Sequence, residues 1–143
     1  MSFDLKMEYG DLVLNNDFQL VYSNEKLIQD MAKMVLTTKG SNPYHPGVGS
    51  TVTEESIGRA LGISESQMEA SISEALELLS ALQSQQSRVQ RVSPGELLAQ
   101  IQNITVVRDE TDSRQFNVLI EVLTQELEQL GVTVPVRVQN TAR

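Results

Sequence analysis

The chain has no cysteine and no tryptophan, only one histidine, and aromatic residues make up 4% of its 143 residues. Without cysteine, neither a disulfide framework nor a thiolate metal site can form. His45 supplies one ligand where a metal site needs several, so we expect no metal and no other cofactor. Because aromatic rings are so few, aliphatic side chains have to form most of the hydrophobic core.

Positive charge is also scarce, because 11 Lys and Arg stand against 19 Asp and Glu, which gives a net charge of −8. Binding to nucleic acid or to an anionic membrane surface relies on clustered positive charge, so the composition argues against both. No apolar run approaches about 18 residues, and the first residues do not form a signal peptide. We therefore expect a soluble protein made in a cytoplasm, with a single domain over residues 1–143.

Hydrophobic alternation predicts strands at the N-terminus. Apolar and polar residues alternate over residues 3–7, which is the period of a strand, and Gly10 interrupts the pattern. The alternation resumes over residues 12–22, around a polar turn at 15–17. We therefore expect a short meander or hairpin before the first helix.

Helical spacing of apolar residues predicts a first helix that begins at a cap formed by Ser23 and Asn24 and ends at Gly40. Its apolar stripe consists of Leu27, Met31, Met34, Val35 and Thr38. A short helix is expected over residues 54–61, ended by Gly62.

A long helix is predicted to begin at a capping box formed by Ser64 and Gln67. Its apolar stripe consists of Met68, Ile72, Ala75, Leu76, Leu79 and Leu82. The following residues, 83–91, are mostly polar, so we expect this end to extend past the core, either as a partner surface or as a solvated helix end. Arg88 and Arg91 are suited to the negative end of the helix dipole.

The C-terminal part is predicted to consist mainly of strands. The segment 93–96, Ser-Pro-Gly-Glu, is typical of a helix start and predicts a short helix reaching Ile101. Strands are expected over residues 104–108 and 116–122, joined by a polar turn at 109–114. Apolar residues on both faces of these strands predict that both faces are covered.

The last segment is the clearest strand in the chain. Every second residue from 132 to 138 is a valine, and Pro135 lies between them. Proline cannot donate a ladder hydrogen bond, which places this strand at a sheet edge. We predict that residues 131–143 are a strand-exchange arm that pairs with another chain, the alternative being an ordinary edge strand blunted by Pro135.

One loop, residues 37–49, collects three of the eight glycines, two of the four prolines and the only histidine. We interpret it as a rigid corner that presents Tyr44 and His45 to an adjoining subunit. Catalysis by His45 is not favoured, because no Gly-x-Ser-x-Gly elbow or second catalytic group accompanies it. The segment 47–50, Gly-Val-Gly-Ser, lacks the lysine and the preceding strand of a phosphate-binding loop.

The nineteen carboxylates offer many pairs for glycoside hydrolysis, but the sequence singles out none of them. Six are more typical of a solvated acidic face: Glu54, Glu55, Glu65, Glu69, Glu74 and Glu77. We therefore predict that the chain is not an enzyme.

The order of the elements resembles the baseplate wedge family of contractile phage tails, which includes the sheath-initiating wedge protein and its counterparts in type VI secretion systems. The pieces are an N-terminal strand pair, a helix ending in Thr37-Thr38-Lys39-Gly40, a loop closing with Pro43-Tyr44-His45-Pro46-Gly47-Val48-Gly49, a helical stretch and a C-terminal sheet. The resemblance spans the whole chain and is strongest from Asp11 to Gly49. Some members of this family carry a tail lysozyme-like label.

The resemblance implies a small α+β domain with N-terminal strands, a long central helix and a C-terminal antiparallel sheet, similar to the inner domain of the sheath subunit. It also implies a structural role in the virion, at the tail baseplate, after assembly in the host cytoplasm. Several copies would surround a symmetric assembly, bind other wedge proteins, sheath subunits and tail tube or hub proteins, and initiate the sheath.

One departure from the family concerns a Glu-Pro-Arg motif, which docks its members to the wedge core bundle and which this chain lacks. The corresponding region is residues 90–96, in which Arg91 and Glu96 are the candidates for that contact. The predicted partner-binding residues are Tyr44, His45, Arg88, Arg91, Glu96, Val132, Val134, Val136 and Val138.

Two other functions remain open at this point. The alternative function is a peptidoglycan-degrading tail hydrolase, in keeping with the lysozyme-like label, which requires a carboxylate of raised pKa in a cleft. The third is a stand-alone adaptor with the same order of elements. The structural role is preferred because no catalytic pair can be identified.

Overall fold

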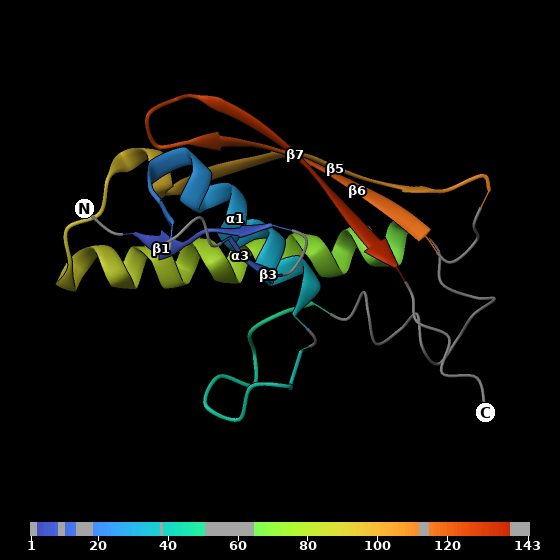
Figure 1. Cartoon of the computed structure of the whole chain (residues 1–143), viewed down its shortest axis with the longest axis horizontal. Coiled ribbons are helices and arrows are strands. Elements are labelled where there is room, and N and C mark those ends of the chain that lie inside the picture. The colour runs from blue at the N-terminus through green and yellow to red at the C-terminus, as the bar shows by residue number, and fades with distance from the viewer. Residues whose placement is uncertain are drawn as a thin grey trace.

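In a computed structural model, two helices pack on one face of a three-stranded antiparallel sheet (Figure 1). The structure describes residues 3–8, 11–13, 19–37, 39–50, 65–111 and 115–137. The predicted α+β class, with its long helix and C-terminal antiparallel sheet, is confirmed. The expected helix at 54–61, the turn at 15–17 and Val138 lie outside the described residues.

The N-terminal segment forms two short antiparallel strand pairs, as the alternation predicted. Strand β1 (Asp4–Leu5) pairs with β4 (Leu20–Val21), and β2 (Met7–Glu8) pairs with β3 (Asp11–Leu12). Gln29 connects both pairs to the first helix, because its side chain accepts the Met7 N–H at 2.8 Å and donates to the Leu5 carbonyl at 2.7 Å.

Helix α1 (Ser23–Leu36) buries four members of the apolar stripe that its periodicity predicted, namely Leu27, Met31, Met34 and Val35. Thr38, the last member of that stripe, lies outside the described residues. The predicted cap is wrong: Tyr22 occupies the cap position without a side-chain hydrogen bond, and Ser23 adopts a φ of +51°. The helix also ends earlier than Gly40, because Thr37 has an extended backbone, with φ −78° and ψ 126°, although its N–H still completes the last helical hydrogen bond to the Lys33 carbonyl at 2.9 Å.

Helix α3 (Glu65–Val89) buries Met68, Ile72, Ala75, Leu76 and Leu79 against the sheet and α1. The prediction that everything from residue 83 onward extends past the core is wrong at Gln83, which is 6% exposed. Its amide is buried because it hydrogen-bonds the segment that follows the helix. Arg88 and Val89 are exposed, as expected for the end of the helix.

The predicted helix from residue 93 to Ile101 is wrong. Only a single 3₁₀ turn forms, η1 (Pro94–Glu96), and β5 (Leu98–Arg108) begins two residues later. The Ser93 hydroxyl donates to the Glu96 carboxylate at 3.2 Å and makes no capping bond to the backbone. Pairing with the next strand from Leu98 onward outweighs the local helix-start signal.

The sheet continues through β6 (Gln115–Thr124) to β7 (Gln129–Arg137), in the order β5-β6-β7. On β6 the predicted alternation buries Phe116, Val118, Ile120 and Val122. The expectation that both faces are covered is wrong, because Leu119 on the opposite face is 41% exposed. β7 is an edge strand of this sheet, as Pro135 predicted.

Candidate functional site

The loop over residues 39–50 is closed at its base by a pair of backbone hydrogen bonds. The Lys39 N–H donates to the Ser50 carbonyl at 3.0 Å, and the Ser50 N–H donates to the Thr37 carbonyl at 2.8 Å. The Ser50 hydroxyl, which is buried, also donates to the Val35 carbonyl at 2.6 Å. The end of the loop is thereby fixed to the last turn of α1.

Two glycines allow this closure. Gly40 and Gly49 have φ angles of +87° and +111°, which disfavour residues with a side chain. At Gly49 a Cβ atom would overlap the Thr37 carbonyl oxygen and approach the Lys39 nitrogen to 3.1 Å. Because the two chain segments at the base of the loop come this close together, only glycine fits at position 49 without displacing its neighbours.

Tyr44 and His45 lie on the exposed part of the loop, and Tyr44 is 88% exposed. The Tyr44 N–H donates to the Asn42 side chain at 3.0 Å, and the Val48 N–H donates to the His45 carbonyl at 3.1 Å. Figure 1 shows that the loop projects beyond α3, away from the sheet. The loop is therefore an ordered protrusion with an aromatic side chain on its surface.

A shallow groove of about 390 Å³ adjoins the loop, between α1 and α3. Its lining residues include Met34 and Leu79 from the helices, Val48 from the loop, and Lys26 and Lys33 from α1. The groove and the loop therefore form one continuous surface of mixed polarity.

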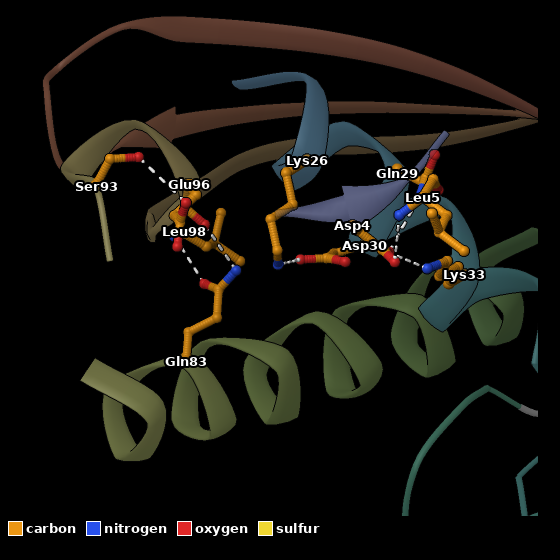
Figure 2. Close-up of polar contacts among 10 residues, drawn as sticks. All are labelled: Asp4, Leu5, Lys26, Gln29, Asp30, Lys33, Gln83, Ser93, Glu96 and Leu98. Carbon is orange, nitrogen blue, oxygen red and sulfur yellow. Dashed lines mark hydrogen bonds and ion pairs between the residues drawn. The ribbon is translucent and has the colours of Figure 1, made fainter. Parts of the chain in front are cut away.

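Two ion pairs lie along α1 on this side of the domain (Figure 2). Lys26 contacts Asp30 at 2.6 Å, and Lys33 pairs with Asp4 of β1. Burial raises the pKa of the Asp30 carboxyl above its ordinary value, and Lys26 offsets this only in part. Burial acts on Asp4 in the same direction, but Lys33 and the other hydrogen-bond donors outweigh it, so the pKa of Asp4 is lowered.

The outer edge of β5 is covered by side chains of α3. The Glu69 carboxylate accepts the Val106 N–H at 3.2 Å, and the Gln83 side chain accepts the Leu98 N–H at 2.9 Å. The Ser80 hydroxyl donates to the Leu98 carbonyl at 3.3 Å. The outward N–H groups of Val106 and Leu98 and the Leu98 carbonyl, to which another strand could otherwise bond, are therefore already hydrogen-bonded.

The opposite edge of the sheet belongs to β7, and its open backbone groups follow from the register. The Thr124 N–H donates to the Glu128 carbonyl at 2.9 Å, and Val118 lies opposite Val134. In an antiparallel ladder, hydrogen-bonded and non-hydrogen-bonded residue pairs alternate. Because Thr124 and Glu128 form a hydrogen-bonded pair, the other opposed pairs of even-numbered residues in β6 and β7 are hydrogen-bonded as well. The odd-numbered residues of β7 point their N–H and carbonyl groups away from β6.

The outward-pointing residues of β7 include Gly131, Thr133 and Pro135. Gly131 and Thr133 each present an N–H and a carbonyl, whereas Pro135 presents only a carbonyl. An added strand could therefore form a regular ladder over the first half of β7, with a missing donor at Pro135.

The residues predicted to bind partners are spread over four regions of the molecule. Tyr44 and His45 lie on the loop, and Arg88 and Arg91 are exposed near the end of α3. Glu96 is 2% exposed and binds Ser93, so its carboxylate is not on the surface. In β7, Val132 is half-buried and the side chains of Val134 and Val136 face the core, while Val138 lies outside the described residues.

Residues 131–137 of the predicted strand-exchange arm lie within β7 and pair with β6 of the same chain. Because Val134 and Val136 are 3% and 1% exposed, this strand is part of the domain core. Its contact with a partner would therefore use the outward backbone edge, while the valine side chains stay in place. The sequence analysis did not identify the outward N–H of Thr133 or the hydrogen bonds of Gln83 to Glu96 and Leu98. The position of Pro135 does indicate that the backbone groups of odd-numbered residues in β7 face away from β6.

The carboxylates expected on a solvated acidic face have differing surroundings. Glu65, Glu74 and Glu77 are exposed, as expected, whereas Glu69 binds the edge of β5. Glu65 lies 3.9 Å from Arg108, and Glu74 lies 3.1 Å from Lys39. Glu54 and Glu55 lie outside the described residues. Within the described part of the chain, no three His, Cys, Asp or Glu side chains are grouped so as to hold a metal ion. Neither described helix is long and apolar enough to cross a membrane.

No known family profile matches the chain, and no curated protein matches it. A solved structure described as a "putative tail lysozyme" from Geobacter sulfurreducens is similar in three dimensions, with a TM-score of 0.61. The match covers 82% of this chain and 93% of that chain, at 14% sequence identity. The chain therefore shares the fold of that protein.

Proposed function

We propose that the chain is a structural component of a contractile, phage tail-like machine. In this role it belongs to the tail baseplate, joins wedge proteins, and initiates assembly of the sheath around the tail tube. Its fold is similar to that of a protein described as a "putative tail lysozyme", and this description of a tail protein supports the proposal together with the resemblance in the order of elements. The observation that carries the proposal concerns the described residues only: side chains of α3 bond the outer edge of β5, whereas the register leaves the odd-numbered backbone groups of β7 facing away from β6.

Because the two edges differ, we expect an added strand to bind at β7 and not at β5. A strand from a sheath subunit can bond the outward groups of Gly131 and Thr133, because main-chain hydrogen bonds supply the affinity. Addition at β5 is less favourable, because α3 side chains already bind the backbone of Leu98 and the Val106 N–H. One open edge per subunit would give every copy in a ring the same orientation relative to the first sheath layer.

Replacing Thr133 with proline tests the proposal. The Thr133 N–H points away from β6, so Thr133→Pro removes a donor from the open edge and leaves the β6–β7 ladder in place. Thr133→Val retains the N–H and serves as the matched control. We expect both variants to fold, and sheath assembly on baseplates to be lost in the proline variant only.

Normal sheath assembly with folded Thr133→Pro protein would show that this edge does not initiate the sheath. Hydrolase activity is tested separately by incubating the purified protein with labelled peptidoglycan. Release of soluble fragments that requires this chain would contradict a purely structural role.

A further inference from the structure

We infer that loop 39–50 is a second docking element, which inserts Tyr44 into an uncharged pocket of a partner protein other than the strand donor. This inference goes beyond the proposed function, and its distinction between two partners rests on the strand addition proposed there. Tyr44 is 88% exposed, whereas Phe116 is 4% exposed in the core. A tyrosine ring buries a large area on binding while its hydroxyl keeps a hydrogen bond, which explains the enrichment of tyrosine at protein interfaces.

Hydrogen bonds hold the base of the loop closed in the absence of a partner. Backbone hydrogen bonds between Lys39, Ser50 and Thr37 close its base, and the Ser50 hydroxyl fixes it to Val35. A rigid element loses little conformational entropy on binding, so more of the contact energy appears as affinity. Such ordering around a single exposed aromatic ring distinguishes this loop from a mobile connection.

The charge of the loop indicates the chemistry of the partner. No Asp, Glu, Lys or Arg occurs over residues 40–50, although the whole chain has a net charge of −8. The adjacent charge, Lys39, is paired with Glu74 of α3 at 3.1 Å. A partner surface with an uncharged pocket therefore fits the loop, because burying an unpaired charge against it would be unfavourable.

The position of the loop separates it from the open edge of the sheet. Figure 1 shows the loop on the far side of α3 from the sheet that contains β7. A partner that surrounds Tyr44 can therefore bind while a strand is added at Thr133. The domain would then connect two different proteins.

Site-specific photo-crosslinking tests this inference in cells that make the full assembly. Tyr44, Thr133 and Glu110 are each replaced by p-benzoylphenylalanine; Glu110 is exposed at the β5–β6 turn and serves as the background control. We expect position 44 to give an adduct that is absent at position 110 and that contains a different chain from the adduct at position 133. No adduct above background, the same chain at 44 and 133, or a second copy of this protein at 44 would overturn the inference.

Binding measurements with the purified crosslinked chain give the second test. Tyr44→Ala should weaken binding more than about tenfold, as expected for a central aromatic contact. Tyr44→Phe should retain most of the affinity, and Thr133→Pro should leave it unchanged. An affinity of Tyr44→Ala within twofold of the wild type would overturn the inference. If the chain captured at position 44 is unrelated to tails, the proposed function fails while the docking role of the loop stands.

Discussion

The side chain of Gln83 accepts the N–H of Leu98 at the outer edge of β5, where a neighbouring strand would otherwise supply the acceptor. Its Oε1 atom accepts the Leu98 N–H and its Nε2 atom donates to the Glu96 carbonyl, each at 2.9 Å (Figure 2). Gln83, Glu96 and Leu98 are all buried, so these hydrogen bonds form away from water. One amide thereby connects the last turns of α3 to the start of the sheet.

Replacing Gln83 with methionine should therefore destabilise the domain. The change preserves much of the side-chain volume but leaves a buried N–H and a buried carbonyl without partners. Each such group costs about 1–3 kcal/mol, so we expect a loss of roughly 2–4 kcal/mol. Urea unfolding measures the loss, with Gln85→Met at an exposed position of the same helix as control. Equal midpoints for the two variants would show that the Gln83 hydrogen bonds do not stabilise the domain.

Alanine substitutions at three glycines of the loop should have graded effects. At Gly47 no atom lies within 4 Å of an added Cβ, so the change should alter stability by less than about 0.5 kcal/mol. At Gly40 only the φ of +87° is unfavourable, which costs about 1 kcal/mol. At Gly49 the angle and the overlap with Thr37 combine, and the loss should reach roughly 2–4 kcal/mol. Thermal unfolding ranks the three variants, and any other order would contradict the closure at Gly49.

Gly95 packs against the start of α1, where a side chain would meet Ser23 and come within 2.7 Å of the Asn24 side-chain oxygen. Gly95→Ala should destabilise by about 1–3 kcal/mol. Adding Ser23→Gly should recover part of this loss, because it removes the Ser23 hydroxyl and relieves the φ of +51° at that position. A double-mutant cycle measures the coupling, and strictly additive effects would contradict the contact between positions 23 and 95.

The periodicity of apolar residues correctly predicted the elements whose burial follows from their own sequence. The period of the apolar residues identified the buried stripe of α1 and the alternation of β6, because each period is a property of one element. The start of β5 was missed because it depends on Gln83, which lies 15 residues earlier in the chain. The helix-start signal at Ser93 is real, but it produces only one turn before strand pairing takes over.

The candidate site was predictable in part for the same reason. Its glycines and prolines identified loop 37–49 as a rigid element, whereas the bridge to Ser50 requires the three-dimensional structure. Glu96 was expected to contact a partner because it lies in the region that corresponds to the Glu-Pro-Arg motif, yet its side chain is buried where η1 packs against α1. The covered edge of β5 could not be inferred, since it depends on how α3 lies along the sheet.

The lowered pKa of Asp4 gives the last prediction, which concerns stability at low pH. A carboxyl whose pKa is lower in the folded state than its ordinary value of 3.8 stabilises the fold above that value. This contribution is lost as the pH falls from 3.8 through the lower folded-state pKa. Asp4→Asn removes it, so the variant should be less stable than the wild type at pH 7 by roughly 1 kcal/mol.

The difference between the two proteins should shrink as the pH falls below 3.8, because protonation then removes the charge of Asp4 in the wild type as well. Asp30 should behave oppositely: its raised pKa means that its contribution is lost as the pH rises from 3.8 through the folded-state pKa. Urea unfolding at pH 7, 5 and 3 measures the first effect, and carboxyl NMR titration of the folded protein orders the two pKa values. The exposed Glu121→Gln change is the control. An Asp4→Asn deficit that is equally large at pH 7 and below 3.8 would assign it to packing, because a loss of charge has to disappear on protonation.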